Sequence, residues 1–162
     1  MSAIERHTLT VLVDNEAGVL ARVIGLFSGR GYNIESLTVA EVDAAAHTSR
    51  ITIVTSGTPQ VIEQIEAQLR RLVPVHRVTN WTAAAGGIER EMALVKVTPG
   101  EAASKLAEKF QARALDETEA EQVFEITDTP TRIDAFIEAL RPLGLVDVSR
   151  TGVAAIARGS EA

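Results

Sequence analysis

The sequence contains no cysteine, few aromatic residues and no long run of apolar side chains. Without cysteine it has no disulfides, no thiol nucleophile and no thiolate ligands for zinc. No stretch approaches the roughly 20 apolar residues of a membrane-spanning helix. The first residues also lack the apolar core of a secretory signal. We therefore expect a cytoplasmic protein that has no membrane partner.

Positive charge is scarce as well. The chain has 16 Lys+Arg against 22 Asp+Glu, which gives a formal net charge of -6. Such a chain repels a phosphate backbone on average, so we expect no nucleic-acid partner. Aromatic residues make up only 4% of the sequence, which leaves few rings for stacking on RNA bases. With 46% hydrophobic residues, the 162 residues can bury the core of one ordinary domain or of two small ones.

Motifs that carry catalysis or bind metals are missing from the sequence. It has no G-x-S-x-G elbow, no phosphate-binding loop and no dinucleotide fingerprint. His7, His47 and His76 are scattered and lack the spacing of a zinc-binding helix. We interpret the acidic run Asp116–Glu121 as an exposed turn, because no recognisable cation loop surrounds it. The prediction is a chain without catalytic residues, metal or cofactor of its own.

The first half of the chain alternates strand and helix periodicities in a fixed order. Apolar residues recur at every second position in four segments and at helical spacing in two. The expected strands are Thr8–Val13, Tyr32–Val42, Ser49–Thr55 and Val75–Trp81, and the expected helices are Val19–Phe27 and Val61–Leu72. The order βαββαβ is typical of two helices packed on one face of an antiparallel sheet.

The second half repeats this order after a stretch of small residues. We assign 1–82 to a first domain, 83–88 to a linker and 89–162 to a second domain. In the second domain the expected strands are Met92–Val97, Ala112–Thr118, Gln122–Thr127, Leu145–Ser149 and Val153–Ala157. One helix is expected at Ala102–Phe110, and Pro130 opens the other. The predicted fold class is α+β, with two tandem ferredoxin-like (βαββαβ) domains of antiparallel sheets and helices on one face.

Two segments of the first half contain residues that fit an amino-acid site. In Asp14–Leu20 (DNEAGVL) a turn leads into a helix, whose free N–H groups attract a carboxylate, and Gly18 lets that carboxylate approach. An ordinary Asn or Asp helix cap explains the same letters equally well. Asn33 and Ile34 offer an amide and an apolar wall, or alternatively a turn residue and a core residue. If two copies joined their sheets side by side, the two segments of different copies would face each other.

The sequence resembles the regulatory (small) subunits of acetolactate synthase, also called acetohydroxyacid synthase. The resemblance is carried by TLTVLVDNEAGVLARVIGLFSGRGYNIESLTVA and continues through SRITIVTSG, IEQIEAQLRRLVPVHRV, EREMALVKV and RTGVAAIARG. It implies an N-terminal ACT domain, which is an amino-acid sensor of βαββαβ order, and a second ACT-like domain. It also implies a homodimer that binds a branched-chain amino acid, usually valine, between two ACT domains.

The resemblance places the effector contacts in two segments and one strand position. They are Asn15, Glu16, Ala17, Gly18, Val19, Leu20, Asn33, Ile34 and Ala40. Members of the family often have Ser or Pro at the position of Ala17, so a hydroxyl contact is lost here while the backbone amides remain. Ala40 matches a small position whose enlargement would crowd the site. Residues 100–124 match the family least, so no contact with a catalytic subunit is carried over there.

The resemblance implies a role in the synthesis of valine, leucine and isoleucine. The catalytic large subunit of such an enzyme uses thiamine diphosphate, Mg²⁺ and FAD to condense pyruvate with pyruvate or 2-oxobutyrate. This chain would activate that partner and confer feedback inhibition by valine. The alternative is a free-standing ACT sensor of another enzyme or of a transcription factor. An acylphosphatase-like hydrolase is disfavoured, because the loop after its first strand would be the acidic Asp14–Glu16, which repels phosphate.

Overall fold

A computed structural model describes residues 2–82 and 87–159 of the chain. They divide into two compact units. The first unit comprises the described residues of Met1–Ile88 together with those of Val153–Ala162, and the second comprises Glu89–Gly152. The division differs from the expected boundaries at the C-terminal end, because Val153 and the residues after it belong with the N-terminal unit. Of the expected linker, residues 83–86 lie outside the described residues, and Gly87 and Ile88 already belong to a strand.

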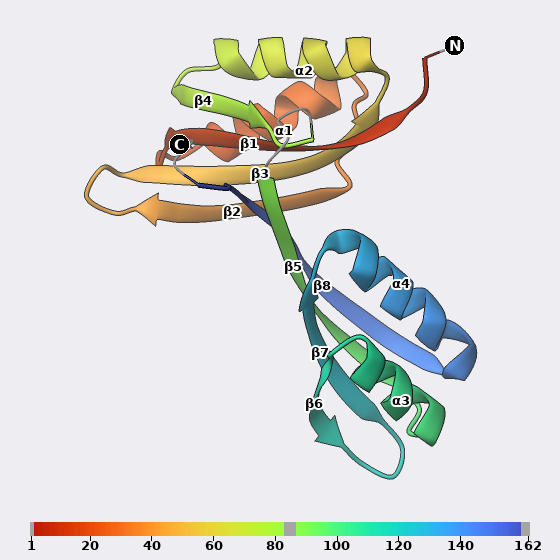
Figure 1. Cartoon of the computed structure of the whole chain (residues 1–162). Coiled ribbons are helices and arrows are strands. Elements are labelled where there is room, and N and C mark those ends of the chain that lie inside the picture. Colours follow the sequence, from red (N-terminus) through yellow and green to blue (C-terminus); the bar gives the residue numbers. More distant parts are fainter. Residues whose placement is uncertain (1, 83–86, 160–162) are drawn as a thin grey trace. The chain divides into compact units, whose positions relative to one another are not determined.

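The first unit is a four-stranded antiparallel sheet with two helices on one face (Figure 1). Its strands are in the order β2-β3-β1-β4. The elements are β1 (Glu5–Asp14), α1 (Val19–Gly29), β2 (Ser36–Asp43), β3 (Thr48–Gly57), α2 (Pro59–Arg71) and β4 (Val75–Asn80). This confirms the ferredoxin-like order. It also leaves β2 at an outer edge of the sheet.

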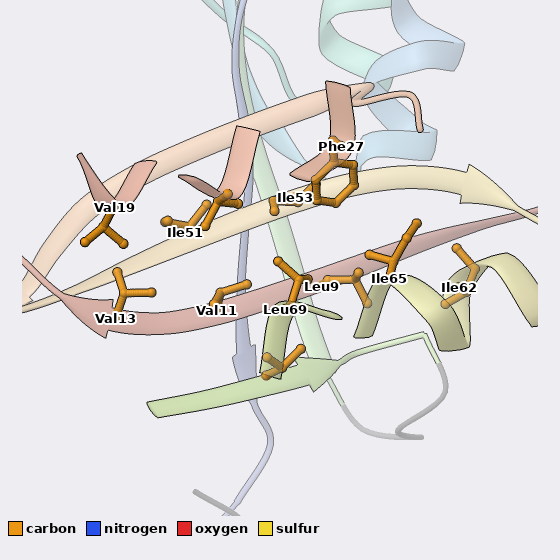
Figure 2. Close-up of a cluster of buried hydrophobic side chains, with 12 residues drawn as sticks. Leu9, Val11, Val13, Val19, Phe27, Ile51, Ile53, Ile62, Ile65 and Leu69 are labelled. Carbon is orange, nitrogen blue, oxygen red and sulfur yellow. The ribbon is translucent and has the colours of Figure 1, made fainter. Parts of the chain in front are cut away.

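Alternation along β1 builds the core of the first unit. Leu9, Val11 and Val13 are at most 2% exposed and point toward the helices, as Figure 2 shows. Both helices contribute buried residues at helical spacing to the same core. These residues are Val19, Val23 and Phe27 of α1 and Ile62, Ile65 and Leu69 of α2. Because successive strand residues face opposite sides, the remaining β1 side chains lie on the face that α1 and α2 do not cover.

The second unit has the same architecture, with its sheet in the order β6-β7-β5-β8. Its elements are β5 (Gly87–Val97), α3 (Glu101–Lys109), β6 (Arg113–Glu117), β7 (Gln122–Asp128), α4 (Pro130–Leu140), a short 3-10 turn (Arg141–Leu143) and β8 (Leu145–Ala157). Buried residues of β5 and β7, such as Val95 and Phe124, pack against Ile133 and Phe136 of α4. Both β5 and β8 extend past the boundary of the unit and continue into the first one.

Two strands differ from the sequence expectation. β8 is one continuous strand where two were expected, although Gly152 within it has a φ of 88°. β2 begins at Ser36 and not at Tyr32, because Gly31 adopts a left-handed φ of 69° and Tyr32 turns back onto α1. There the ring of Tyr32 lies 6.1 Å from that of Phe27, edge to face. The sequence predicted a longer strand because Tyr32 and Ile34 are apolar residues at alternating positions. Both pack against the core, but neither lies in a strand.

The helices are short, from the 9 residues of α3 to the 13 of α2. Within the described ranges, no helix has both the length and the apolar character needed to cross a membrane.

Candidate functional site

The loop between β1 and α1 is held against two neighbouring turns. The backbone N–H of Asp14 donates to the carbonyl of Pro74 (3.2 Å), and that of Asn15 donates to the carbonyl of His47 (2.6 Å). The side-chain amide of Asn15 donates to Glu41 on β2 (2.6 Å). These bonds fix the start of the loop, so that α1 begins at a defined position beside the end of β2.

The N-terminus of α1 carries no side-chain cap. Its N-cap residue is Gly18, with φ 88° and ψ -10°, a conformation that glycine adopts without strain. The sequence left an Asn or Asp cap open as an interpretation, and the structure excludes it. Asn15 binds Glu41, and Asp14 pairs with His76 at 2.5 Å. The first N–H groups of a helix have no acceptor within the helix, so here they face the loop with partial positive charge. Among them, the N–H of Val19 donates to the carbonyl of Glu16 in that loop (3.4 Å).

Access to this helix end is open in a single chain. Asn15, Glu16, Ala17 and Gly18 are all exposed. A Cβ added to Gly18 would meet no heavy atom within 4 Å. A small carboxylate can therefore approach the backbone at this point, as anions do at helix N-termini elsewhere.

Val19 and Leu20 differ in what they present to this surface. The side chain of Val19 is 4% exposed and lies in the core (Figure 2), so only its backbone can face a ligand. Leu20 is 37% exposed and provides an apolar surface next to the helix end. The effector contacts expected from the sequence thus comprise backbone N–H groups and one apolar side chain on this element.

Asn33 and Ile34 lie at the opposite end of the same sheet. The carbonyl of Asn33 accepts a hydrogen bond from Thr55 (2.6 Å), whereas the loop before α1 lies beside Thr48, the partner of Asp14. Thr48 and Thr55 are at the two ends of β3, about 23 Å apart at roughly 3.3 Å per residue. Within one chain the structure therefore keeps the two predicted segments apart. Asn33 is exposed, and Ile34 packs against the edge of the core.

Ala40 lies near the middle of β2, which is an exposed edge of the first sheet. β2 pairs with β3 alone, and its residues from Val39 to Asp43 are exposed. Val39 and Val42 expose 43% and 50% of their surface, which is unusual for two Val residues so close together on one strand. An unpaired edge of this kind offers N–H and C=O groups to another strand.

The charges around the helix end are mainly acidic. Asp14, Glu16, Glu41 and Asp43 all lie on the loop or on the neighbouring end of β2. An isolated anion would be repelled by these carboxylates, while a zwitterion offers them its ammonium group. No group of three or more His, Cys, Asp and Glu side chains in the described ranges could hold a metal ion. The arrangement is therefore suited to an amino acid more than to a phosphate or a simple anion.

Sequence reasoning missed the residues that hold the loop in place. Glu41, His47 and His76 come from β2, the hairpin after it and β4, and they contact the loop through the hydrogen bonds given above. His47 has a positive φ of 49° in that hairpin. No local pattern reveals such partners, because they lie 26 to 62 residues from the loop along the chain.

Comparison with known proteins agrees with this architecture along most of the chain. The family model described as "AHAS small subunit-like ACT domain" matches residues 9–77. The family model described as "Small subunit of acetolactate synthase" matches residues 90–159. Together they cover both units of the fold.

Individual relatives match over nearly their full length. The acetolactate synthase isozyme 3 small subunit of Salmonella typhimurium is 44% identical over 161 residues, which is 96% of this chain and 98% of that protein. The probable acetolactate synthase small subunit of Archaeoglobus fulgidus is 39% identical over 160 residues, covering 96% of this chain and 99% of the relative. The crystal structure of the small subunit from Thermotoga maritima superimposes with a TM-score of 0.83 at 35% identity, over 96% of this chain and 99% of that one. The chain therefore belongs to the family of acetolactate synthase small subunits.

Proposed function

We propose that this chain activates a catalytic acetolactate synthase large subunit and makes that enzyme sensitive to valine. Two copies associate through β2, and valine binds at the junctions between them. The large subunit supplies the chemistry with thiamine diphosphate, Mg²⁺ and FAD, while this chain supplies the regulation. The observation that carries the proposal is the uncapped, exposed end of α1 beside an unpaired edge strand.

A twofold axis at the middle of β2 explains why the two predicted segments lie so far apart in one chain. Two antiparallel β2 strands that pair about Val39 and Ala40 place the Asp43 end of one strand beside the Ser36 end of the other. The loop before α1 lies at the Asp43 end, through the bond from Asn15 to Glu41. Asn33 lies at the other end, just before Ser36. Each junction then combines the helix end of one copy with Asn33 and Ile34 of its partner.

Such a junction fits each part of a valine molecule. The carboxylate lies on the N–H groups around Gly18, where the helix dipole favours negative charge. The ammonium is oriented by Asn33 and attracted by the nearby acidic side chains. The isopropyl group lies between Leu20 of one copy and Ile34 of the other, which are both only partly buried in the single chain. The small side chain of Ala40 leaves room beside the junction.

Feedback inhibition requires valine to bind the inhibited arrangement of the assembly more tightly than the active one. A coupling of about 1–3 kcal/mol, or roughly 5- to 150-fold in affinity, is usual for such effects. By linkage, addition of the large subunit then changes the affinity for valine by the same factor. The affinity for valine, measured with and without the large subunit, should therefore differ by the same factor that describes the inhibition.

The test is to add this chain to the isolated large subunit and follow acetolactate formation with and without valine, leucine or isoleucine. We expect the rate to rise on addition of the chain and to fall again with valine. A chain that binds valine but leaves the large subunit unchanged would overturn the assignment in favour of a free-standing sensor. A chain that activates the enzyme without any response to the three amino acids would overturn the effector site.

A further inference from the structure

The face of the first sheet that α1 and α2 leave free is covered in part by the end of the chain itself. Val153 and Ala155 of β8 are 1% and 5% exposed, whereas Ile156 is 58% exposed, so one side of this segment faces inward. On the sheet, Thr52 and Val54 of β3 point away from the helices and are 4% and 1% exposed. The segment Val153–Ala157 therefore covers part of the second face of the first sheet.

Side chains of β2 and β3 hold this segment by its backbone. The N–H of Val153 donates to the hydroxyl of Ser36 (3.2 Å), and its carbonyl accepts from the hydroxyl of Thr38 (2.6 Å). Arg50 donates to the carbonyl of Ala155 (3.4 Å). Because Arg50 pairs with Ala40 in the sheet, the segment runs along β2 from Ser36 toward Ala40.

β2 depends on these contacts because it has few others. It is an edge strand with one ladder partner, β3, and five of its eight residues are exposed. A strand at an edge opens more readily than a central one, since fewer buried contacts hold it. The segment Val153–Ala157 adds hydrogen bonds at Ser36 and Thr38, in the half of β2 that precedes Ala40.

The other end of β8 is firmly anchored in the second unit. Arg150, two residues before the boundary, makes two hydrogen bonds to Glu91 (2.9 and 2.8 Å) and one to Asp134 (2.6 Å). The side chain of Glu91 is 3% exposed and that of Arg150 is 31% exposed, so the carboxylate of this pair is shielded from water.

We infer that Val153–Ala157 is a strap that holds β2 in the position needed to bind the effector, and that Thr38 is the residue that fastens it. The inference rests on the proposed function, since β2 is the strand through which two copies form the site. Thr38 is a positioning residue, because it acts through β2 and does not touch the effector. The response to valine therefore depends on the last strand of the chain as well as on the helix end.

The test compares Thr38→Val, which keeps the shape of the side chain but loses the hydroxyl donor, with Thr38→Ser, which keeps the donor. Amide hydrogen exchange of the chain alone is measured in 36–43 and 153–157. We expect roughly three- to tenfold faster exchange in both segments for Thr38→Val, the range set by one net hydrogen bond, and little change for Thr38→Ser. Valine titration of the assembled enzyme should show a half-inhibiting concentration raised by a similar factor for Thr38→Val only, with the activity in the absence of valine unchanged.

Three outcomes would contradict parts of this picture, and they are distinguishable. Unchanged exchange in both segments would overturn the strap itself. Faster exchange with an unchanged valine titration would overturn its link to the effector. A parent protein without any valine response would overturn the proposed function, while the exchange data would still test the strap. Arg50→Met, compared with Arg50→Lys, repeats the test at Ala155 should Thr38→Val fold poorly.

Discussion

Gly18 has a backbone conformation that favours glycine, and it leaves the end of the helix open to a ligand. Its φ of 88° disfavours most side chains, and its missing Cβ leaves the helix end open. Asp and Asn have the same shape and both tolerate a left-handed conformation better than other residues, but only Asp adds a charge. The pair Gly18→Asp and Gly18→Asn therefore distinguishes repulsion of the effector carboxylate from strain or crowding.

We expect Gly18→Asp to abolish valine inhibition. Two carboxylates about 4 Å apart repel by about 4 kcal/mol at the effective dielectric constant of a protein surface, which exceeds the usual allosteric coupling. Gly18→Asn should retain measurable binding. Isothermal titration with valine, together with inhibition of the assembled enzyme, measures both. Undiminished affinity in Gly18→Asp would place the carboxylate elsewhere, and equal losses in both variants would mean that charge is not the cause.

The contacts of Arg150 lead us to expect that this residue stabilises the folded protein. Its hydrogen bonds to Glu91 raise the pKa of its guanidinium further above the ordinary value; burial opposes this, and Asp134 adds to it. Arg150→Met leaves the buried Glu91 carboxylate without its partner, which should cost about 3 kcal/mol of unfolding free energy. Urea unfolding of the variant measures this loss.

The matched control for Arg150→Met removes both charges. In the double variant Glu91→Gln with Arg150→Met, no unpaired charge is buried, and most of the lost stability should return. A double variant that is no more stable than Arg150→Met alone would show that the pair is not what stabilises β5 against β8.

At the scale of single elements, the stability of the N-terminus of α4 should depend on pH. Thr129 caps the helix, and Asp128 just before it accepts hydrogen bonds from the Thr129 N–H (2.7 Å) and from Arg132 (2.6 Å). Burial raises the pKa of Asp128, but the hydrogen bond and charge of Arg132 and the Thr129 N–H lower it by more, so the net shift is downward. A carboxyl whose folded pKa is depressed adds stability above its unfolded pKa of about 3.9, and loses it as the pH falls through the folded value.

Asp128→Asn should therefore lower the stability at neutral pH by about 0.5–1 kcal/mol, since the ion pair is partly exposed. The difference from the parent protein should shrink as the pH falls below about 4, because the parent then protonates Asp128. Denaturant unfolding between pH 3 and pH 7 measures both curves. A difference that stays constant over this range would exclude the charge of Asp128 as its source.

The elements themselves were largely predictable from the sequence, for a physical reason that also explains the exceptions. Residues such as Leu9, Val11 and Val13, or Ile62, Ile65 and Leu69, repeat with the period of their own element, because one face of each is buried. Tyr32 breaks this correspondence, since it packs against Phe27 outside any strand. The continuity of β8 through Gly152 was also missed, because a glycine there is typical of a turn.

The candidate site was predictable only in part. Gly18 and the start of the helix can be predicted from the local sequence. The absence of a side-chain cap depends on distant residues, because Glu41 binds the side chain of Asn15 and His76 binds that of Asp14. The position of Asn33 at the far end of the sheet follows from the register of β3 with β1. The effector contacts as a set rest on the resemblance to the family, and they remain predictions.

At the scale of the whole molecule, the proposed dimer is tested at the edge of the first sheet. Val39 is 43% exposed in the middle of β2. A lysine at this position in both copies would place two like charges next to each other at the proposed twofold axis. We expect Val39→Lys to shift the chain toward a monomer and to weaken valine binding at least tenfold. Analytical ultracentrifugation and isothermal titration measure these two effects.

A lysine on an edge strand of the second sheet is the matched control. Val146 of β8 is 53% exposed, so Val146→Lys makes the same chemical change away from β2. It should leave both the association of the chains and the valine affinity of the first unit as they are in the parent protein. If Val39→Lys remained dimeric and bound valine normally, the copies would not meet along β2.

The division into domains was the feature that sequence patterns described least well. A run of small residues precedes Glu89 in the sequence, but nothing comparable marks the return of the chain at Val153. Val153 and Ala155 alternate with exposed neighbours, as in any half-buried strand. Periodicity reports that a side chain is buried, and it does not report which sheet buries it.

That return also sets an order of events during synthesis on the ribosome. The N-terminal sheet leaves the exit tunnel first, but the strand that covers its second face is translated after Gly152. At about 5–20 residues per second, the intervening residues take several seconds to make. For that interval the first sheet has one face without its final layer, and a stop codon just ahead of Val153 would make this unfinished form permanent.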